Sequence, residues 1–228
     1  MDSNAKILLI TFALFLIAII HQYIQDRKLL ETVTKSHRGT RTERLMVLKL
    51  LKSGIPHQTI FHDLYLKKRG GNYCQIDLVV ATKVGIIVFE IKKFNGWIFG
   101  LENQTNWTQV LAYGKQKYHF YNPILQNNKH ILDLKNQLPQ FQNVPFYSVI
   151  VFFGDCSFRN LEFVPNNTFL VKSSRAIKVV KEILEQNEPT TYVSKSEIVN
   201  LFRSAALNGE SDEIKSEHIE NIKRNFRY

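Results

Sequence analysis

The stretch QIDLVVATKVGIIVFEIK, from Gln75 to Lys92, decides the fold of this chain. Two runs rich in apolar and β-branched residues flank the segment Thr82-Lys83-Val84-Gly85, a pattern typical of two β-strands joined by a tight turn. Three charged side chains interrupt these runs, Asp77 in the first strand and Glu90 and Lys92 in the second. A metal-dependent phosphodiesterase needs these residue types at this spacing.

The expected hairpin brings its acidic residues together. Alternate residues of a strand point to the same side, so Glu90 shares a face with Lys92, and Asp77 shares one with Gln75 and Val79. If the hairpin is symmetric about its turn, Asp77 and Glu90 face each other with Cβ atoms about 5 Å apart. Like charges at that distance are destabilising without a counter-ion. The pattern therefore predicts a bound divalent cation, and the alternative is a surface ion pair on a hairpin.

The expected cation is Mg²⁺, with Mn²⁺ as the alternative. Such a hard ion takes few protein carboxylates and keeps water positions open for a phosphate. Bound here, it would polarise a phosphoryl oxygen and lower the pKa of a bound water. Lys92 would position that water or stabilise the charge of the transition state. We expect Asp77, Glu90 and the carbonyl of Ile91 as ligands.

Glu43 is the fourth member of the expected site. The segment Thr40 to Lys52 is expected to form a helix, in which Glu43 lies on the same face as Met46 and Leu50. Burying a lone carboxylate costs several kcal/mol. Glu43 therefore either reaches water at the edge of the apolar stripe or points into a site with a cation. We assign it to the site, completing the metal shell directly or through a water.

A later helix supplies candidates for substrate binding. Asn122-Pro123 is a typical helix start, and the helix is expected to end at about Leu138. Gln126 and His130 lie opposite its apolar residues, which by geometry alone favours a solvated face. The expected buried face consists of Ile124, Ile131, Leu134 and Leu138. Gln75 of the first strand and Gln109, close to Trp107, are further candidates for substrate binding, and Gln109 is a candidate contact to phosphate.

Three ordered motifs carry a family resemblance. They are Q-I-D at Gln75, E-x-K-x-x-x-G-W-I-x-G at Glu90 and N-P-x-x-Q-x-x-x-H at Asn122. Together they resemble the NERD (nuclease-related) domain of the PD-(D/E)xK nuclease superfamily, over roughly residues 36 to 155. The resemblance implies an α/β fold of the restriction-endonuclease-like type, with a mixed sheet flanked by helices. It also implies that Gln126 and His130 flank the nuclease cleft and touch substrate.

The chain departs from the family pattern at a few positions beside the motifs. Thr42 stands where the family usually has a glycine before the helix glutamate, and Leu78 where a histidine often follows Q-I-D. Ile91 and Lys93 replace a common threonine and asparagine. These departures leave every expected metal ligand and the lysine in place. We therefore expect them to affect the fine geometry and the activity level, and not the fold.

The N-terminal region is expected to be a membrane anchor. Residues 7–24 are almost entirely apolar and would span about 27 Å as a helix, enough for a thin bilayer. A secretory signal is the alternative, but an A-x-A cleavage pattern does not follow the run. Cations follow the apolar run and predict an N-terminus outside and a cytoplasmic body. They are Arg27, Lys28, Lys35, Arg38, Arg41 and Arg44.

The hydropathy pattern, the net charge and the cysteines indicate the domain organisation and the class of partner. We expect a short tail (1–6), a transmembrane helix (7–24), a polar linker (25–35), a nuclease-like domain (36–188) and a helical C-terminal tail (189–228). A net charge of +10 suits a polyanionic partner, and a lysine-rich coding bias is the alternative. The two cysteines form no metal-binding pattern and are expected to be free thiols.

These observations favour a membrane-anchored nuclease that acts on the cytoplasmic side, on DNA first and RNA second. The rival interpretation is a non-catalytic module on a nuclease fold that holds nucleic acid or recruits a partner complex to the membrane. A third is that the basic residues near the anchor serve anionic lipid. The C-terminal tail is expected to carry no site and either to dock on the body or to bind a protein partner.

Overall fold

The computed structural model describes residues 3–159 and 165–225. The ends of the expected N-terminal and C-terminal tails, residues 1–2 and 226–228, lie outside the described residues. The helices are α1 (Ser3–Glu31), α2 (Arg41–Lys52), α3 (Pro123–Lys135), α4 (Ala176–Gln186), α5 (Lys195–Asn208) and α6 (Asp212–Asn225). Short 3₁₀ turns lie at His57–Thr59, Ala112–Gly114 and Pro139–Gln142.

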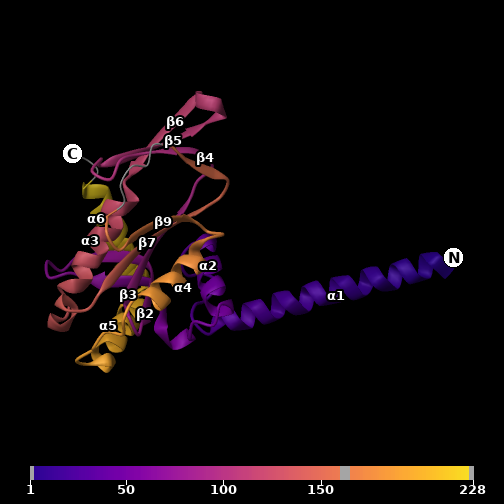
Figure 1. The fold of residues 1–228 in the computed structure, drawn as a ribbon, viewed down its shortest axis with the longest axis horizontal. Coiled ribbons are helices and arrows are strands. Elements are labelled where there is room, and N and C mark those ends of the chain that lie inside the picture. Colours follow the sequence, from indigo (N-terminus) through magenta and orange to yellow (C-terminus); the bar gives the residue numbers. More distant parts are fainter. Residues whose placement is uncertain (1–2, 160–164, 226–228) are drawn as a thin grey trace.

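A five-stranded mixed sheet forms the centre of the body, in the order β1-β2-β3-β7-β9 (Figure 1). Its strands are β1 (Ile60–Lys67), β2 (Tyr73–Thr82), β3 (Gly85–Lys93), β7 (Phe146–Phe153) and β9 (Thr168–Lys172). The first three are antiparallel, whereas β3, β7 and β9 are parallel. Every residue of β7 is buried, as expected from its continuous apolar run.

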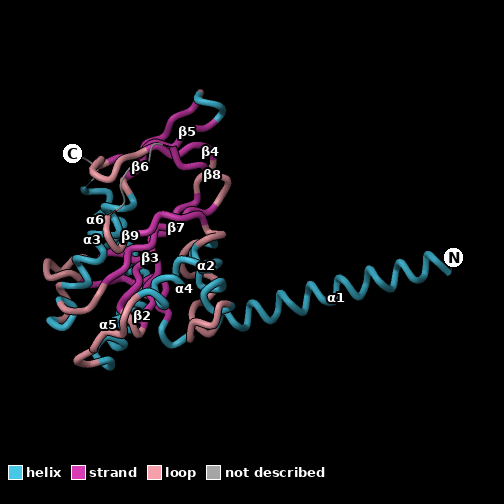
Figure 2. The backbone as a smooth tube through the Cα atoms, in the orientation of Figure 1, coloured by secondary structure: helices cyan, strands magenta, loops and turns pink. Residues whose placement is uncertain are grey.

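A second, four-stranded sheet stands beyond the end of the central one, as Figure 2 shows. It consists of β6 (Gln116–Tyr121), β5 (Asn106–Leu111), β4 (Gly96–Phe99) and β8 (Cys156–Arg159), in that order. Trp107 and Ile98 of this sheet pack with Ile150 and Phe152 of β7 in one apolar cluster. This shared core fixes the second sheet to the central one.

Helices cover both faces of the central sheet. On one face, α2 and α4 bury residues such as Leu50 and Val180 against β3 and β7. On the other, α3 and α5 bury Leu134 and Phe202 against β1 and β2. The mixed sheet flanked by helices that the sequence predicts is therefore present.

The hairpin of β2 and β3 has the predicted symmetric register. Thr82 pairs with Gly85, and the ladder continues to Leu78 opposite Phe89. Asp77 and Glu90 are the next residues along each strand. The two acids therefore lie where the paired part of the hairpin ends.

Both β1 and β2 change the direction of their side chains at an aspartate. Asp63 has a left-handed backbone (φ 54°), and the β1–β2 ladder passes from His62 opposite Leu78 to Leu64 opposite Ile76. On β2, Ile76 and Val79 share one core although an odd number of positions separates them. The expectation that Val79 shares a face with Asp77 is wrong, because Asp77 opens towards a pocket while Val79 is buried in the core beneath α3 and α5.

α1 extends away from the body as a long rod in Figure 1. Within the segment Ile7–Glu31, an 18-residue window has a mean hydropathy of 2.4 and none of that window is buried, so by length and composition the helix can cross a membrane. The expected linker at 25–35 is instead helical as far as Glu31, because this end of α1 packs on α2. Asp26 pairs with Lys52 at 2.6 Å, and Leu29 packs against the core.

The boundary expected at residue 189 does not separate a body from a tail. α5 buries Ile198, Phe202 and Ala205 in the same core as β1 and β2. α6 then returns to β2, where the His218 ring N–H donates to the carbonyl of Tyr73 at 3.0 Å. The C-terminal helices are therefore docked on the body, the first of the two arrangements expected for them.

Candidate active site

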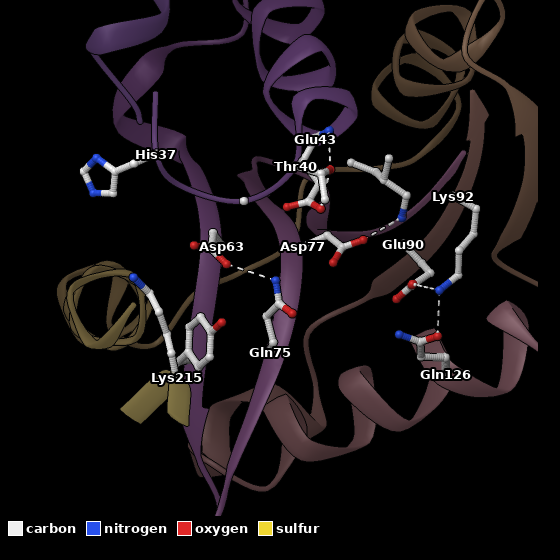
Figure 3. Close-up of a pocket in the computed structure, with 13 residues that line it drawn as sticks. His37, Thr40, Glu43, Asp63, Gln75, Asp77, Glu90, Lys92, Gln126 and Lys215 are labelled. Atoms are coloured by element: carbon white, nitrogen blue, oxygen red, sulfur yellow. Dashed lines mark hydrogen bonds and ion pairs between the residues drawn. The ribbon is translucent and has the colours of Figure 1, made fainter. Parts of the chain in front are cut away.

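A pocket of about 470 Å³ opens where β2 and β3 separate (Figure 3). Its lining comes from β1, β2 and β3, from the start of α2, from the first turn of α3 and from α6. The lining residues are His37, Gly39, Thr40, Glu43, Asp63, Tyr65, Gln75, Asp77, Glu90, Ile91, Lys92, Gln126 and Lys215. The pocket thus brings together all four expected catalytic residues.

Just beyond the last backbone pair of the β2–β3 ladder, the side chain of Asp77 accepts a hydrogen bond from β3. Its Oδ2 accepts from the backbone N–H of Ile91 at 2.7 Å. Ile91 lies between Glu90 and Lys92, so this bond holds the carboxylate of Asp77 beside both functional side chains of β3. The position of Asp77 follows from the end of backbone pairing at Leu78 and Phe89.

Glu90 and Lys92 form an ion pair inside the pocket. Lys92 Nζ lies 2.7 Å from Glu90 Oε1 and donates to Gln126 Oε1 at 3.0 Å. Glu90 is only 1% exposed, so the acidic half of the pair is shielded from water, whereas the Lys92 side chain is 22% exposed. An ammonium has three N–H donors, and the two bonds described leave one for a phosphate oxygen or a water.

The start of α2 points Glu43 into the pocket. Thr40 is the N-cap of the helix, and its hydroxyl donates to Glu43 Oε1 at 2.6 Å. The other carboxylate oxygen, Oε2, lies 3.5 Å from His62 Nε2. Gly39 (φ 54°) leaves the space that Glu43 occupies, because a Cβ at Gly39 would collide with Glu43 Oε2 and with His62. Glu43 is buried, so it points into the site and does not reach water.

The surroundings of Asp77 and Glu43 shift their pKa values in opposite directions. Burial, and then the negative charges of Glu90 and Glu43, raise the pKa of Asp77 well above its usual range. Burial also acts to raise the pKa of Glu43, but the neighbouring His62 and Thr40 outweigh it and lower that pKa. Acids with divergent pKa values in one pocket are typical of functional sites.

The donor set fits a hard divalent cation. Within the part of the chain that the structure describes, Glu43 Oε2 and Glu90 Oε2 are buried without a hydrogen-bond partner, each with an imidazole nitrogen, of His62 and of His130 respectively, 3.5 Å away. A cation would supply the missing partner and neutralise the repulsion that raises the pKa of Asp77. No three His, Cys, Asp or Glu side chains among the described residues form a metal-binding group by themselves. Backbone oxygen and water would therefore have to complete the shell, which suits Mg²⁺.

The expected substrate-binding residues divide into two groups. Gln75 and Gln126 line the pocket, and the Gln75 amide donates to Asp63 Oδ1 at 3.0 Å. The expectation for Gln109 is not met: it lies outside the pocket, and its amide donates to the carbonyl of Asn95 at 2.8 Å.

The assignment of His130 to the solvated side of α3 is also wrong. His130 is buried, with Nε2 3.5 Å from Glu90 Oε2. Asn127, one turn earlier, donates to the carbonyl of Val88 at 2.9 Å and to Ser148 Oγ at 2.8 Å. Polar groups of β3 and β7 thus contact Asn127 and His130, so the buried face of α3 includes polar residues beside its apolar stripe. His130 of α3 therefore lies against the buried carboxylate of Glu90.

Several residues at the site were not predicted from the sequence, among them His37, Arg38, Asp63 and Lys215. His37, Asp63 and Lys215 line the pocket. Arg38 is 5% exposed, and its Nε donates to Asp63 Oδ2 at 2.8 Å. Asp63 and Lys215 belong to none of the sequence motifs. No local signal could have placed them there.

Comparison with known proteins identifies the family of the chain. The nuclease-related domain, NERD, matches residues 38–153. The chain belongs to the NERD family. An uncharacterised protein from Bacillus anthracis is 31% identical over 136 residues, which are 58% of this chain and 62% of that relative. The alignment thus spans less than two thirds of the relative, and no solved structure matches the chain. The NERD match includes the acids and Lys92 but ends before α4, α5 and α6.

Proposed function

We propose that this NERD protein is a membrane-anchored, metal-dependent nuclease that hydrolyses phosphodiester bonds. DNA is the first candidate substrate and RNA the second. The observation that carries the proposal is the joint placement of Asp77, Glu90 and Lys92 around the N–H of Ile91. A second support is the pair of carboxylate oxygens left without partners in the described structure.

Mg²⁺ or Mn²⁺ would be held by Asp77, Glu90, the carbonyl of Ile91 and Glu43, the last directly or through a water. Bound there, the ion would polarise a phosphoryl oxygen and lower the pKa of a water. Lys92, fixed by Glu90 and Gln126, holds the attacking water or stabilises the charge that develops on the phosphate. The amide groups of Gln75 and Gln126 on the pocket wall orient the phosphate.

The anchor places this reaction at a membrane. α1 is long and apolar enough to span one, and cations follow its apolar part. We therefore propose a single-pass protein with its N-terminus outside and its NERD domain in the cytoplasm.

The test is cleavage of DNA by the full-length chain in detergent. With Mg²⁺ or Mn²⁺ the wild type is expected to degrade DNA, and Asp77→Asn and Lys92→Ala are expected to lose activity by about 10³-fold. Lys93→Ala is the matched control, because Lys93 is the adjacent lysine and is exposed to solvent. Cleavage that persists undiminished in both variants would overturn the proposal.

A second candidate is a non-catalytic module that binds nucleic acid or recruits a partner complex. The net charge of +10 favours it, because such a charge suits a polyanionic partner whether or not that partner is cleaved. Under this alternative the wild type binds DNA and shows no cleavage with either metal. Metal-stimulated cleavage that is lost in the variants would rule it out.

A further inference from the structure

We propose that Lys215 of α6, with His37, forms a second phosphate-binding end of the pocket. It would hold a phosphate next to the scissile one on the same nucleic-acid strand. For its class of substrate the inference rests on the proposed function. Lys215 lies outside the region that matches the NERD family, so α6 would add to the domain a contact of this chain's own.

The two lysines of the pocket lie on opposite sides of its acids. Figure 3 shows Lys92 and Gln126 on one side of Asp77, and His37 and Lys215 on the other. Four acids also line the pocket, namely Glu43, Asp63, Asp77 and Glu90. A polyanion that enters such a pocket needs cations on both sides of the acids, because the acids alone would repel it.

Contacts of α6 with the sheet hold Lys215 in place. The His218 ring N–H donates to the carbonyl of Tyr73 at 3.0 Å, and the His218 ring packs edge-on against Tyr65 with centroids 5.6 Å apart. Lys215 precedes His218 by three residues and so lies on the same helix face. Tyr65 itself lines the pocket, so these contacts direct Lys215 towards it.

Arg38 fixes the turn from which α6 starts. Its guanidinium donates to the carbonyl of Asp63 at 2.7 Å and to the carbonyl of Ala206 at 2.9 Å, and pairs with Glu210 at 2.9 Å. These bonds join β1 to the end of α5 and to the turn before α6. The position of Lys215 therefore depends on buried contacts of the body.

Of the two residues that line this end of the pocket, His37 already has Nε2 3.4 Å from Glu210 Oε2, so Lys215 offers the more available cation. The acid beside it, Asp63, is neutralised by Arg38 at 2.8 Å. The ion pair of Lys215 itself is with Asp212, at 3.4 Å, and the Asp212 side chain is 97% exposed. Such a pair is screened by water and weak. A phosphate can replace Asp212 as the partner of Lys215 at little cost.

The experiment measures binding of full-length protein in detergent to a fluorescently labelled single-stranded DNA at several salt concentrations. All proteins carry Asp77→Asn, which keeps the DNA intact. Adding Lys215→Gln is expected to weaken binding about tenfold and to reduce the slope of log affinity against log salt by about one. Lys178→Gln, which breaks the exposed Lys178–Glu182 pair of α4, is the matched control and is expected to change neither.

Two further variants separate a charge effect from a folding effect. Lys215→Arg keeps the positive charge and is expected to restore most of the binding. Asp212→Asn frees Lys215 from its weak partner and is expected to leave binding unchanged or tighten it up to about threefold.

The inference would be overturned if Lys215→Gln left the DNA affinity and the salt slope at the values of the Asp77→Asn protein. It would also be overturned if the Asp77→Asn protein bound no DNA. Cleavage is measured separately with Asp77 in place. If that protein fails to cleave with either metal while Lys215→Gln still weakens binding, hydrolysis is refuted and the binding site stands.

Discussion

Asp77 Oδ2 accepts a 2.7 Å hydrogen bond from the backbone N–H of Ile91, so a side chain of β2 binds the backbone of β3 where their ladder ends. This bond decides the geometry of the site. It holds one acid beside Glu90 and Lys92, which flank Ile91 in sequence. A short interruption of a regular hairpin therefore creates the pocket.

Asp77→Asn is expected to stabilise the protein in the absence of metal. The pKa of Asp77 is raised in the folded state, so ionising it at neutral pH costs the folded protein free energy. Asparagine keeps an acceptor for Ile91 and removes the charge. We expect the free energy of unfolding to rise by about 1 kcal/mol. The gain should be present above the folded-state pKa of Asp77 and disappear as the pH falls to the ordinary carboxylate range, measured by denaturant unfolding.

Asp63→Asn is the matched control, because it changes the facing aspartate of the neighbouring strand. Asp63 pairs with the buried Arg38 at 2.8 Å, so its loss leaves that cation with the half-exposed Glu210 as its remaining acidic partner. We expect a destabilisation of about 2–3 kcal/mol. Equal effects of the two substitutions would contradict the electrostatic distinction between these acids.

Gly39→Ala is expected to displace Glu43 and impair the site. The new methyl group would collide with Glu43 Oε2 and His62, at a backbone φ of 54°. We expect a clear drop in stability and in any metal-dependent cleavage. Gly54→Ala is the control, since Gly54 also has a positive φ (92°) but its Cβ would meet open space. If both variants lose cleavage alike, backbone strain and not the collision with Glu43 is responsible.

Glu210 is expected to stabilise the docked C-terminal helices in a pH-dependent way. Burial acts to raise its pKa, but hydrogen bonds from Arg38 and Lys35 outweigh it and lower the pKa to about 2. A carboxylate with a lowered folded-state pKa stabilises the protein above its ordinary pKa of about 4.3, and this contribution is lost as the pH falls towards about 2.

Thermal unfolding of wild type and Glu210→Gln at several pH values tests this contribution. We expect the wild type to be more stable by about 0.5–1 kcal/mol at pH 7, because the Glu210 side chain is 36% exposed and water screens it. The difference should vanish at the acid end of the range. A difference that grows on acidification would contradict the sign of the pKa shift.

The proposed orientation in the membrane can be tested with single cysteines. Cys74 and Cys156 are both buried, and burial raises the pKa of Cys74 to about 12, so neither should react with a maleimide. In intact cells an impermeant maleimide is expected to label Asn4→Cys. Lys115→Cys, at the exposed turn between β5 and β6, should react only after permeabilisation. The reverse pattern would place the NERD domain outside.

Local sequence determined the elements that depend on short-range patterns. The turn at Thr82–Gly85 sets the hairpin register, and the register brings Asp77 and Glu90 to adjacent strand positions. The N-cap Thr40 and the apolar stripe of α2 place Glu43 on the inward face. These inferences succeed because hairpin pairing and helix periodicity are set by neighbouring residues.

Sequence reasoning failed where the partner of a residue lies far away in the chain. A helix wheel placed His130 in solvent, but polar groups on β3 and β7 receive that face of α3. Alternation placed Val79 beside Asp77, but the strand changes phase at Asp77. Neither outcome follows from the residues on either side.

The sequence by itself thus determined the acid–lysine hairpin, the inward Glu43 and an N-terminal helix that can span a membrane. Only the tertiary structure decided that α5 and α6 return to β1 and β2, and that Lys215 closes the far side of the pocket. The physical reason is that α5 docks through burial of Ile198 and Phe202 against strands more than a hundred residues earlier. Arg38 then ties that docked turn to Asp63. Such contacts depend on the whole folded chain, and no local pattern specifies them.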